Sequence, residues 1–349
     1  MKTTFVSTVA VASVTRQSIL KTQGELVGAQ KEVTTGRLAD VGRTLGTRTG
    51  QAVSLRQEHA RLGTFMATNE MAGSRLETTQ LTLDQLRETA DGFLASLVST
   101  RDTTTGAKAL GQQAAEGLKG LIASLNTTSG GQHLFGGIHS DAAPMADYFA
   151  TPAAASKQAV DNAFAAAFGI AQTDPGAAAI SAADMQTFLD GDFRALFDDP
   201  QWGANWSAAS SQNMQSRISS AEVVDTSVNA NEQAMRKLAM AYTMVADLGA
   251  DGLNEGAFRA VAETATRLIS EGIHEITALQ GRVGGAQQRI AQVNERMSVQ
   301  VDILAKDIAG LENVDPFEAA SRVTTLMTQL ETGYALTARI QRLSILNYL

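Results

Sequence analysis

The chain has no cysteine, few aromatic residues and no long apolar run. Without cysteine in its 349 residues, disulfide bonds, thiolate metal sites and cysteine nucleophiles are all excluded. Aromatic residues make up only 5% of the chain, so Ala, Leu, Ile and Val are expected to form the core. Such a core suits helix packing better than a deep ligand pocket. No run approaches the ~20 apolar residues that a membrane span needs, so no span is expected.

Basic residues are scarce in the middle of the chain. Residues 130–255 carry 15 acidic and 5 basic residues, whereas residues 1–50 carry 7 basic and 3 acidic residues. No basic stripe with interleaved aromatic residues is present to neutralise phosphates, which argues against nucleic-acid binding. The middle of the chain is therefore expected to form an acidic, solvated surface.

Residues that could form a catalytic or metal site are scattered. The four histidines lie at positions 59, 133, 139 and 274, too far apart in sequence for a local metal motif. His274 and Glu275 lack the second histidine of the helical zinc-protease pattern, and the glycine pairs match no phosphate-loop spacing. We therefore expect a protein that is not an enzyme, with no catalytic residues, no cofactor and no metal site.

What the sequence does contain is a heptad repeat of apolar residues. Apolar residues recur at every seventh position from 269 to 311, and a second ladder, broken at Asn69, lies between 55 and 97. A helix over 269–311 would run about 60 Å, too long to bury against itself, so it must lie along other helices. The predicted bundle seam comprises Leu55, Leu62, Leu76, Leu83, Ile269, Ile276, Val283, Ile290, Met297, Leu304 and Leu311.

Two heptad ladders separated by most of the chain predict a fold built from both chain ends. We predict a mainly α protein, an elongated antiparallel helical bundle or coiled coil formed by the N- and C-terminal segments, with a smaller mixed α+β insert. The expected parts are an N-terminal assembly helix and connector (1–50), the N-terminal half of the bundle (51–129), the acidic outer insert (130–255), the long C-terminal bundle helix (256–314) and a C-terminal assembly helix (315–349).

Local signals refine this frame. The glycine-rich stretch 37–50 lacks periodicity and is expected to be an extended connector. Residues 132–137 predict a hairpin-like element, and residues 218–228 alternate weakly, as a strand would. Trp202 and Trp206 are expected to anchor the small core of the insert rather than to form a binding cage. Helices are predicted over 11–35, 51–100, 106–126, 181–197, 231–248 and from Pro316 onward.

Several polar and small residues interrupt the predicted bundle helices. Gln280, Gln287 and Asn294 could form polar layers that fix the register, but Leu279, Ala286 and Val293 are expected to take the seam and to leave those amides at its edge. Each glycine in a helix interior costs roughly 1 kcal/mol relative to Ala. Two interpretations stay open: simple tolerance, or close helix approach in a bundle that yields. These glycines are Gly63, Gly73, Gly92, Gly272, Gly281, Gly284 and Gly285.

Apolar stripes at both chain ends also need burial. A lone helix with one apolar stripe gains little in water, because nucleation is costly and the stripe stays wet. The two tails can pair with each other or with tails of neighbouring subunits, and the pattern alone does not decide between these. The predicted assembly residues are Ala12, Ile19, Leu26, Val33, Val323, Leu330, Leu336, Ile340, Leu343, Leu346 and Leu349.

Five segments together resemble the flagellin superfamily. The closing Arg342-Leu-Ser-Ile-Leu-Asn-Tyr-Leu349 is the most specific of them. The others resemble the turn after the first helix, a Phe-Gly-Gly element, a glycine-bearing bundle position and the break before the last helix. They are Thr34-Thr-Gly-Arg37, His133-Leu-Phe-Gly-Gly137 with Pro144, Arg282-Val-Gly-Gly285, and Asp315 to Ala320.

Within the superfamily the chain is most similar to the hook-filament junction proteins. Arg37-Leu-Ala-Asp-Val-Gly42 departs from the flagellin pattern of Arg-Ile-Asn, and the Asn-Tyr-Leu ending is unlike the usual flagellin ending. The resemblance implies a secreted, extracellular subunit, exported by the flagellar type III route and polymerised between hook and filament. The implied partners are copies of itself in a helical or ring-like lattice, another hook-associated junction protein, flagellin and an export chaperone.

Two alternatives to the junction subunit stay open. One is a filament flagellin subunit. The other belongs to a different class, a membrane-surface-binding amphipathic protein whose cationic N-terminal helix lies on anionic lipid.

Overall fold

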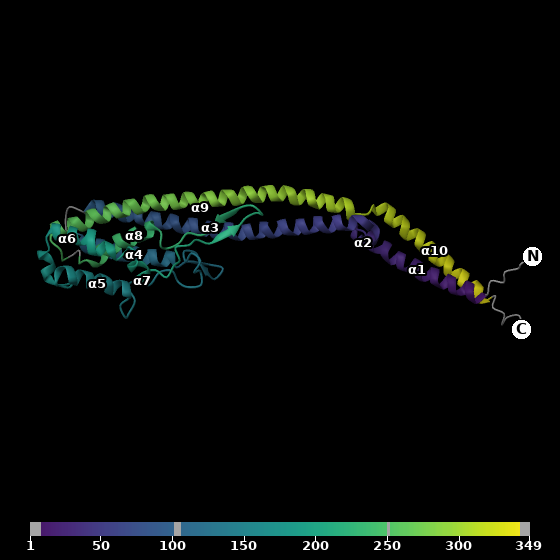
Figure 1. The fold of residues 1–349 in the computed structure, drawn as a ribbon, viewed down its shortest axis with the longest axis horizontal. Helices are drawn as coiled ribbons and strands as arrows, with labels where there is room; N and C mark the ends of the chain where they lie inside the picture. The colour runs from purple at the N-terminus through teal and green to yellow at the C-terminus, as the bar shows by residue number, and fades with distance from the viewer. Residues whose placement is uncertain (1–7, 101–105, 250–251, 343–349) are drawn as a thin grey trace, which may run out of the picture. The chain divides into compact units, whose positions relative to one another are not determined.

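The computed structural model describes residues 8–100, 106–249 and 252–342 (Figure 1). They form two compact units, which we call the terminal unit (residues 8–64 and 297–342) and the central unit (residues 65–296). Both units are dominated by long helices, and the strands form only two small antiparallel sheets among the described residues. The prediction of a mainly α helical bundle with a smaller α+β insert is confirmed.

The terminal unit is built around two antiparallel helices, which lie side by side in Figure 1. Gly333 packs so closely that a Cβ there would lie 3.0 Å from the Ile19 Cγ1 atom. Farther along the pair, Gln23 Nε2 donates a 2.6 Å hydrogen bond to the Tyr334 hydroxyl. The elements of this unit are α1 (Thr8–Thr35), α2 (Val41–Leu45), the 3-10 turn η1 (Gly46–Arg48), the start of α3 (Thr49–Thr100), the end of α9 (Glu255–Glu312) and α10 (Pro316–Arg342).

The expected extended connector over 37–50 is wrong, because most of this stretch is helical. Asp40 has extended backbone geometry, and its Oδ1 atom accepts a 2.9 Å hydrogen bond from the Arg43 amide, so it caps the start of α2. Gly46, with φ of +53°, then ends α2 and begins η1, which leads into α3. Repeated glycines hid this short helix, although the Asp40 cap was a readable signal.

In the central unit, α3 and α9 run antiparallel. Asn69 on α3 bonds to Asn294 on α9, and Asp84, farther along α3, accepts from Gln280, which is earlier on α9. The predicted seam residues of this unit are all buried, as one apolar stripe facing another requires. They are Leu76, Leu83, Ile269, Ile276, Val283 and Ile290.

A pair of amides, of which Asn69 is buried and Asn294 half-buried, interrupts this apolar seam. Asn69 is fully buried, and its Nδ2 atom donates both to Asn294 Oδ1 (2.7 Å) and to the backbone carbonyl of Ile218 (2.9 Å). Asn294 is half-buried, so its amide lies at the edge of the seam as expected, and from there it bonds to the buried Asn69. Sliding one helix past the other would break the Asn69–Asn294 bond, so this pair favours one register of the seam, and the bond to Ile218 holds the insert against α3.

Helices α4 (Ala107–Leu125) and α8 (Gln233–Asp247) pack together beside the seam. The ring of Tyr242 on α8 lies over Gly117, where a Cβ would come within 3.0 Å of it. The same ring lies 5.1 Å from the Phe93 ring on α3, centroid to centroid. A side chain at position 117 would therefore push Tyr242 away from both helices.

The helix-interior glycines divide into two groups. Gly272 allows close approach, since a Cβ there would lie 3.0 Å from Leu238 Cδ2. The other predicted interior glycines meet nothing within 4 Å beyond their own helix, so close approach within the chain does not explain them. They are Gly63, Gly73, Gly92, Gly281, Gly284 and Gly285.

The core of the insert is aromatic, which the low overall aromatic content did not predict. A row of rings runs from Phe164 to Phe188, Phe193, Phe197 and the stacked pair Trp202 and Trp206, with neighbouring centroids 4.8–6.3 Å apart. Both Trp rings are fully buried, so their predicted role as anchors is confirmed.

Short helices carry this aromatic row. The predicted helix over 181–197 is present as α6 and η3, a π-helical segment whose wider turn keeps successive aromatic residues on the core side. Helix α5, by contrast, lies in an alanine-rich stretch for which no helix was predicted. The supporting elements are α5 (Ala155–Phe168), η2 (Pro175–Ala179), α6 (Ala182–Phe188), η3 (Leu189–Phe193) and α7 (Gln201–Asn205).

Two small hairpins complete the insert. The first pairs β1 (Thr128–Ser129) with β2 (Gln132–His133), so the predicted hairpin-like segment 132–137 supplies only the second strand of the hairpin. The second pairs β3 (Gln215–Arg217) with β4 (Val223–Asp225), so the predicted strand over 218–228 is instead a turn and one arm of a hairpin.

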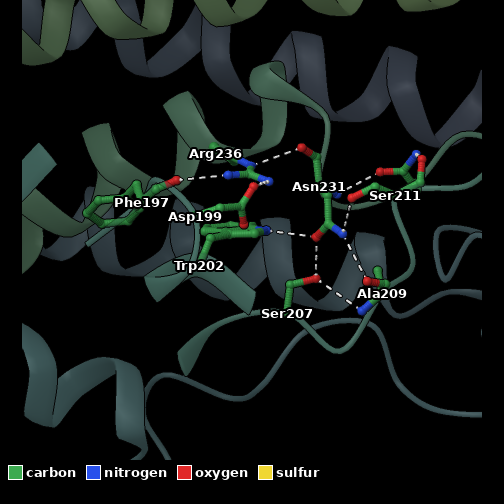
Figure 2. A network of polar contacts seen from close by, with 9 residues as sticks. Phe197, Asp199, Trp202, Ser207, Ala209, Ser211, Asn231 and Arg236 are labelled. Atoms are coloured by element: carbon green, nitrogen blue, oxygen red, sulfur yellow. Dashed lines mark hydrogen bonds and ion pairs between the residues drawn. The ribbon is translucent and has the colours of Figure 1, made fainter. Parts of the chain in front are cut away.

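Asn231 joins the loops around Trp202 (Figure 2). Its Oδ1 atom accepts from Trp202 Nε1 (2.8 Å) and Ser207 Oγ (2.7 Å), and its Nδ2 atom donates to the Ala209 carbonyl (2.9 Å). Its backbone carbonyl accepts from Nε of the buried Arg236 (2.9 Å). The polar groups of this network bond to each other, so the network stabilises the loops of the insert.

Gly137 gives a test of this loop packing. Its φ is +62°, and a Cβ there would lie under 3.0 Å from the carbonyl oxygens of Ser210 and Gln212. Gly130 has a similar φ of +59° but meets nothing within 4 Å. We expect Gly137→Ala to lower the free energy of unfolding by about 2–4 kcal/mol, and Gly130→Ala by only about 1 kcal/mol from backbone strain. Urea denaturation measures both, and equal losses would contradict the close contact.

Candidate assembly surfaces

In the terminal unit, the turn after α1 pairs with the residues directly before the break at Asp315. The Leu38 amide donates to the Glu312 carbonyl (2.8 Å), and the Val314 amide donates to the Gly36 carbonyl (3.0 Å). Arg37 and Asn313 face each other in this short antiparallel bridge. Gly36, with φ of +68°, provides the left-handed turn that ends α1 and brings the chain alongside the α9–α10 break.

A buried carboxylate secures this junction on the side of α1. Glu32 is buried, and its Oε1 atom accepts from the Ala39 amide (3.2 Å). Its Oε2 atom accepts from Arg322 on α10 (3.1 Å), which also pairs with Glu318. The link between α1 and α10 is therefore electrostatic at this end and apolar farther along.

A second buried carboxylate secures the junction on the side of α9. The Glu312 side chain is fully buried, and its Oε2 atom lies 2.5 Å from Nη2 of Arg56 on α3. Arg56 itself is half exposed. Glu32, Arg56 and Glu312 were not among the predicted site residues, because a sequence pattern pairs charges only within one helix. The one sequence signal for this pair was the position of Glu312 directly after Leu311, the last residue of the heptad ladder.

Removing Arg56 tests this junction. Arg56→Met leaves the Glu312 carboxylate buried without a partner. We expect the free energy of unfolding of the terminal unit to fall by about 2 kcal/mol, between the values typical of exposed and buried ion pairs. Hydrogen exchange of amides in 50–60 and 305–312 measures this loss. The exposed pair of Arg61 with Glu58 supplies the control, Arg61→Met, for which little change is expected. Equal protection in both variants would contradict the assignment.

The predicted assembly residues that the structure describes are covered to different degrees in the α1–α10 pair. Leu343, Leu346 and Leu349 lie outside the described residues, and Val33 and Leu336 are exposed. The remaining six are half-buried, so the two tails pair within one chain. They are Ala12, Ile19, Leu26, Val323, Leu330 and Ile340.

This pairing leaves other apolar side chains open to solvent. Val14, Leu20 and Val27 on α1 are 62–66% exposed, and Phe317 at the start of α10 is 87% exposed. A groove of about 450 Å³ also lies between α1 and α10, with Val14, Ile19 and Leu336 among its lining residues. A two-helix unit has one mutual contact and therefore cannot cover its other apolar faces. These open apolar groups are the candidate assembly surface.

The predicted seam residues of the terminal unit are less uniformly covered than those of the central unit. Leu62, Met297 and Leu311 are buried, whereas Leu55 and Leu304 are half-buried. Val53, Val299 and Ile303 in the same helices are about half exposed. The parts of α3 and α9 that belong to this unit thus also expose apolar side chains to solvent.

The described residues contain no group of three or more His, Cys, Asp or Glu side chains placed to hold a metal ion. The strongest polar cluster in the insert is Asp247, which accepts from the Tyr148 hydroxyl (2.6 Å) and pairs with Lys157 (3.1 Å). Burial raises the pKa of Asp247 above its ordinary value. Each group of this cluster already has a partner, so it clamps α5 to α8.

None of the described helices combines the length and the apolar content needed to cross a membrane.

Both ends of the chain match models of the same protein family. Residues 6–140 match the bacterial flagellin N-terminal helical region, and residues 266–349 match the bacterial flagellin C-terminal helical region. Together the two matches cover well over half of the chain, and the chain belongs to the flagellin superfamily. Proteins of this superfamily are structural subunits that polymerise into the extracellular bacterial flagellum, and they are not enzymes.

A solved structure shares the fold. It is described as that of a flagellar hook-associated protein from Vibrio parahaemolyticus, with a TM-score of 0.52 and 9% sequence identity. The match covers 76% of this chain and 97% of that one. No curated protein sequence matches the chain significantly.

Proposed function

We propose that this flagellar subunit polymerises at the hook-filament junction, as hook-associated protein 3 does, and adapts the hook side to the flagellin filament. The observation that carries assembly is that α1 and α10 pair within the chain and still expose Val14, Leu20, Val27 and Phe317. Several large apolar side chains exposed on one pair of helices favour a contact with another molecule. Further copies of the chain would cover it, in a helical or ring-like lattice.

The junction position draws on three further observations. The segment from Arg37 to Gly42 departs from the flagellin pattern, and the Asn-Tyr-Leu ending is unlike that of flagellins. The fold also resembles that of a protein described as hook-associated. The proposed partners besides the chain itself are another hook-associated junction protein, flagellin and an export chaperone, with export by the flagellar type III route.

Charge placed on the open apolar face tests assembly. We expect Val27→Asp on α1 and Met327→Asp on α10 to leave the folded monomer within about 0.5 kcal/mol, because both side chains are exposed in one chain. Polymerisation, followed by sedimentation and electron microscopy, should fall at least tenfold, because each Asp would be desolvated in the lattice.

The matched controls are Ser13→Asp and Thr325→Asp. Both residues are exposed, polar and bonded only to their own helix, and each adds the same charge to the same helices. If the controls also lose assembly, the effect comes from added charge in general, and the proposal that the exposed apolar side chains form the assembly contact is contradicted. Binding of wild-type protein to anionic vesicles without self-association would instead favour a membrane-surface protein.

Cells that lack this protein test its position. If it is the junction subunit, electron microscopy should show hooks without filaments, and flagellin should be shed into the medium. Expression of the wild-type chain in the same cells should restore filaments. Absence of any secreted flagellin would indicate that the chain is itself the filament subunit, and normal filaments would contradict both positions.

A further inference from the structure

In the central unit, α3 carries a row of carboxylates beside its seam. Glu70, Glu77, Asp84 and Asp91 recur at every seventh residue, and each directly follows a buried seam residue. Seven residues make about two helical turns, so the row runs along one side of the helix with a spacing of roughly 10 Å. Asp84 has partners within the chain. The other three are exposed and take part in no hydrogen bond or ion pair with the described residues.

Helix α9 carries a row of arginines with the same spacing. Arg282, Arg289 and Arg296 are also seven residues apart, and each directly precedes a buried seam residue. Arg289 is exposed and has no polar partner in the part of the chain that the structure describes. Arg282 bonds to Glu232 through Nη2, and Nη2 of Arg296 lies 4.0 Å from Glu222. Both side chains are more than half exposed, so the row keeps open N–H donors.

The two rows lie on opposite sides of the seam and cannot pair within one chain. Antiparallel helices that share a seam are related by a two-fold rotation, so positions that follow seam residues lie on one side in both helices, and positions that precede them lie on the other. The contacts agree with this geometry. Asp84 accepts from Gln280 on one side, whereas Arg75 and Arg282, which precede seam residues, both bond to the insert on the other.

The register of the seam sets the two rows at matching heights. Residues 69 and 84 of α3 lie about level with residues 294 and 280 of α9, to which they bond. Each arginine of the row is therefore about two or three residues, or roughly 4 Å, along the axis from one carboxylate of the other row. The offset is the same throughout, because both rows repeat every seventh residue. The matched positions are Glu70 and Arg296, Glu77 and Arg289, and Asp84 and Arg282.

The shapes of the two outward helix faces also match. Beside the carboxylate row, Met71 and Leu81 are 73% and 64% exposed. Beside the arginine row, Gly281 and Gly285 meet nothing within 4 Å beyond their own helix, which leaves the backbone of α9 bare. The distance between packed helices depends on the side chains at the contact, so large side chains on one face and glycines on the other allow a close approach.

We propose that these faces form a lateral contact between copies of the chain, in which the carboxylate row on α3 of one copy binds the arginine row on α9 of the next. The inference rests on the proposed self-assembly and adds a contact of the central unit to that of the terminal unit. Because the two faces differ, each copy keeps one of them free for a further copy. Contacts of this heterologous kind build rings or helical filaments.

Glu77→Lys and Arg289→Glu test this contact. Both side chains are exposed and lack partners among the described residues, so helicity and thermal unfolding of the monomer should not change. Each variant sets like charges opposite each other between copies. We expect the critical concentration for polymerisation to rise about three- to tenfold, and the difference from wild type to shrink in about 0.5 M NaCl. The charge-matched controls are Glu116→Lys and Lys108→Glu, at exposed positions of α4, which should polymerise as the wild type does.

An equimolar mixture of Glu77→Lys and Arg289→Glu shows whether the rows meet between copies. In the mixture the new lysine of one variant faces the new glutamate of the other, so co-sedimentation should contain both chains, at the critical concentration of the wild type. Normal assembly of either variant alone would overturn the proposal, as would equal defects in the α4 controls or a mixture that stays impaired. Wild-type protein that fails to polymerise would contradict the proposed function itself, and this contact with it.

Discussion

The antiparallel contact between α3 and α9 is the interaction on which both units depend. These helices contain 52 and 58 residues and carry one apolar stripe each, so neither gains enough alone to stay helical in water. Their mutual burial orders the central unit, and the ends of the same two helices form part of the terminal unit. The Asn69–Asn294 pair adds little apolar burial, but it favours one register.

The long-range frame was readable from the sequence because a heptad repeat reports on burial directly. The seam from Ile269 to Ile290 and its partner from Leu76 to Leu83 needed only the spacing of apolar residues. The break at Asp315 and Pro316 was readable for a similar reason, since proline restricts the residue before it. A pattern that depends on one residue type at a fixed spacing can be interpreted without knowledge of the tertiary contacts.

The rest was harder because it depends on contacts between distant segments. The aromatic row of the insert was missed because composition was averaged over the chain, although nine of the 18 aromatic residues lie between Tyr148 and Trp206. The Arg56–Glu312 pair joins positions far apart in sequence, and no periodicity links them. The tails illustrate the same limit: the stripe predicted their need for burial, but only the structure shows that they pair and which faces stay open.

The bridge between Gly36 and Val314 joins residues on either side of the whole central unit. Closing the long loop between Gly36 and Val314 costs conformational entropy. We therefore expect this bridge to form after the intervening chain has compacted, or together with the pairing of α3 and α9. A nascent chain emerging from the ribosome has its first helix long before that helix has anything to pair with. Because α1 and α10 lie on opposite sides of the central unit in the sequence, their paired form can exist only after the whole central unit has been synthesised.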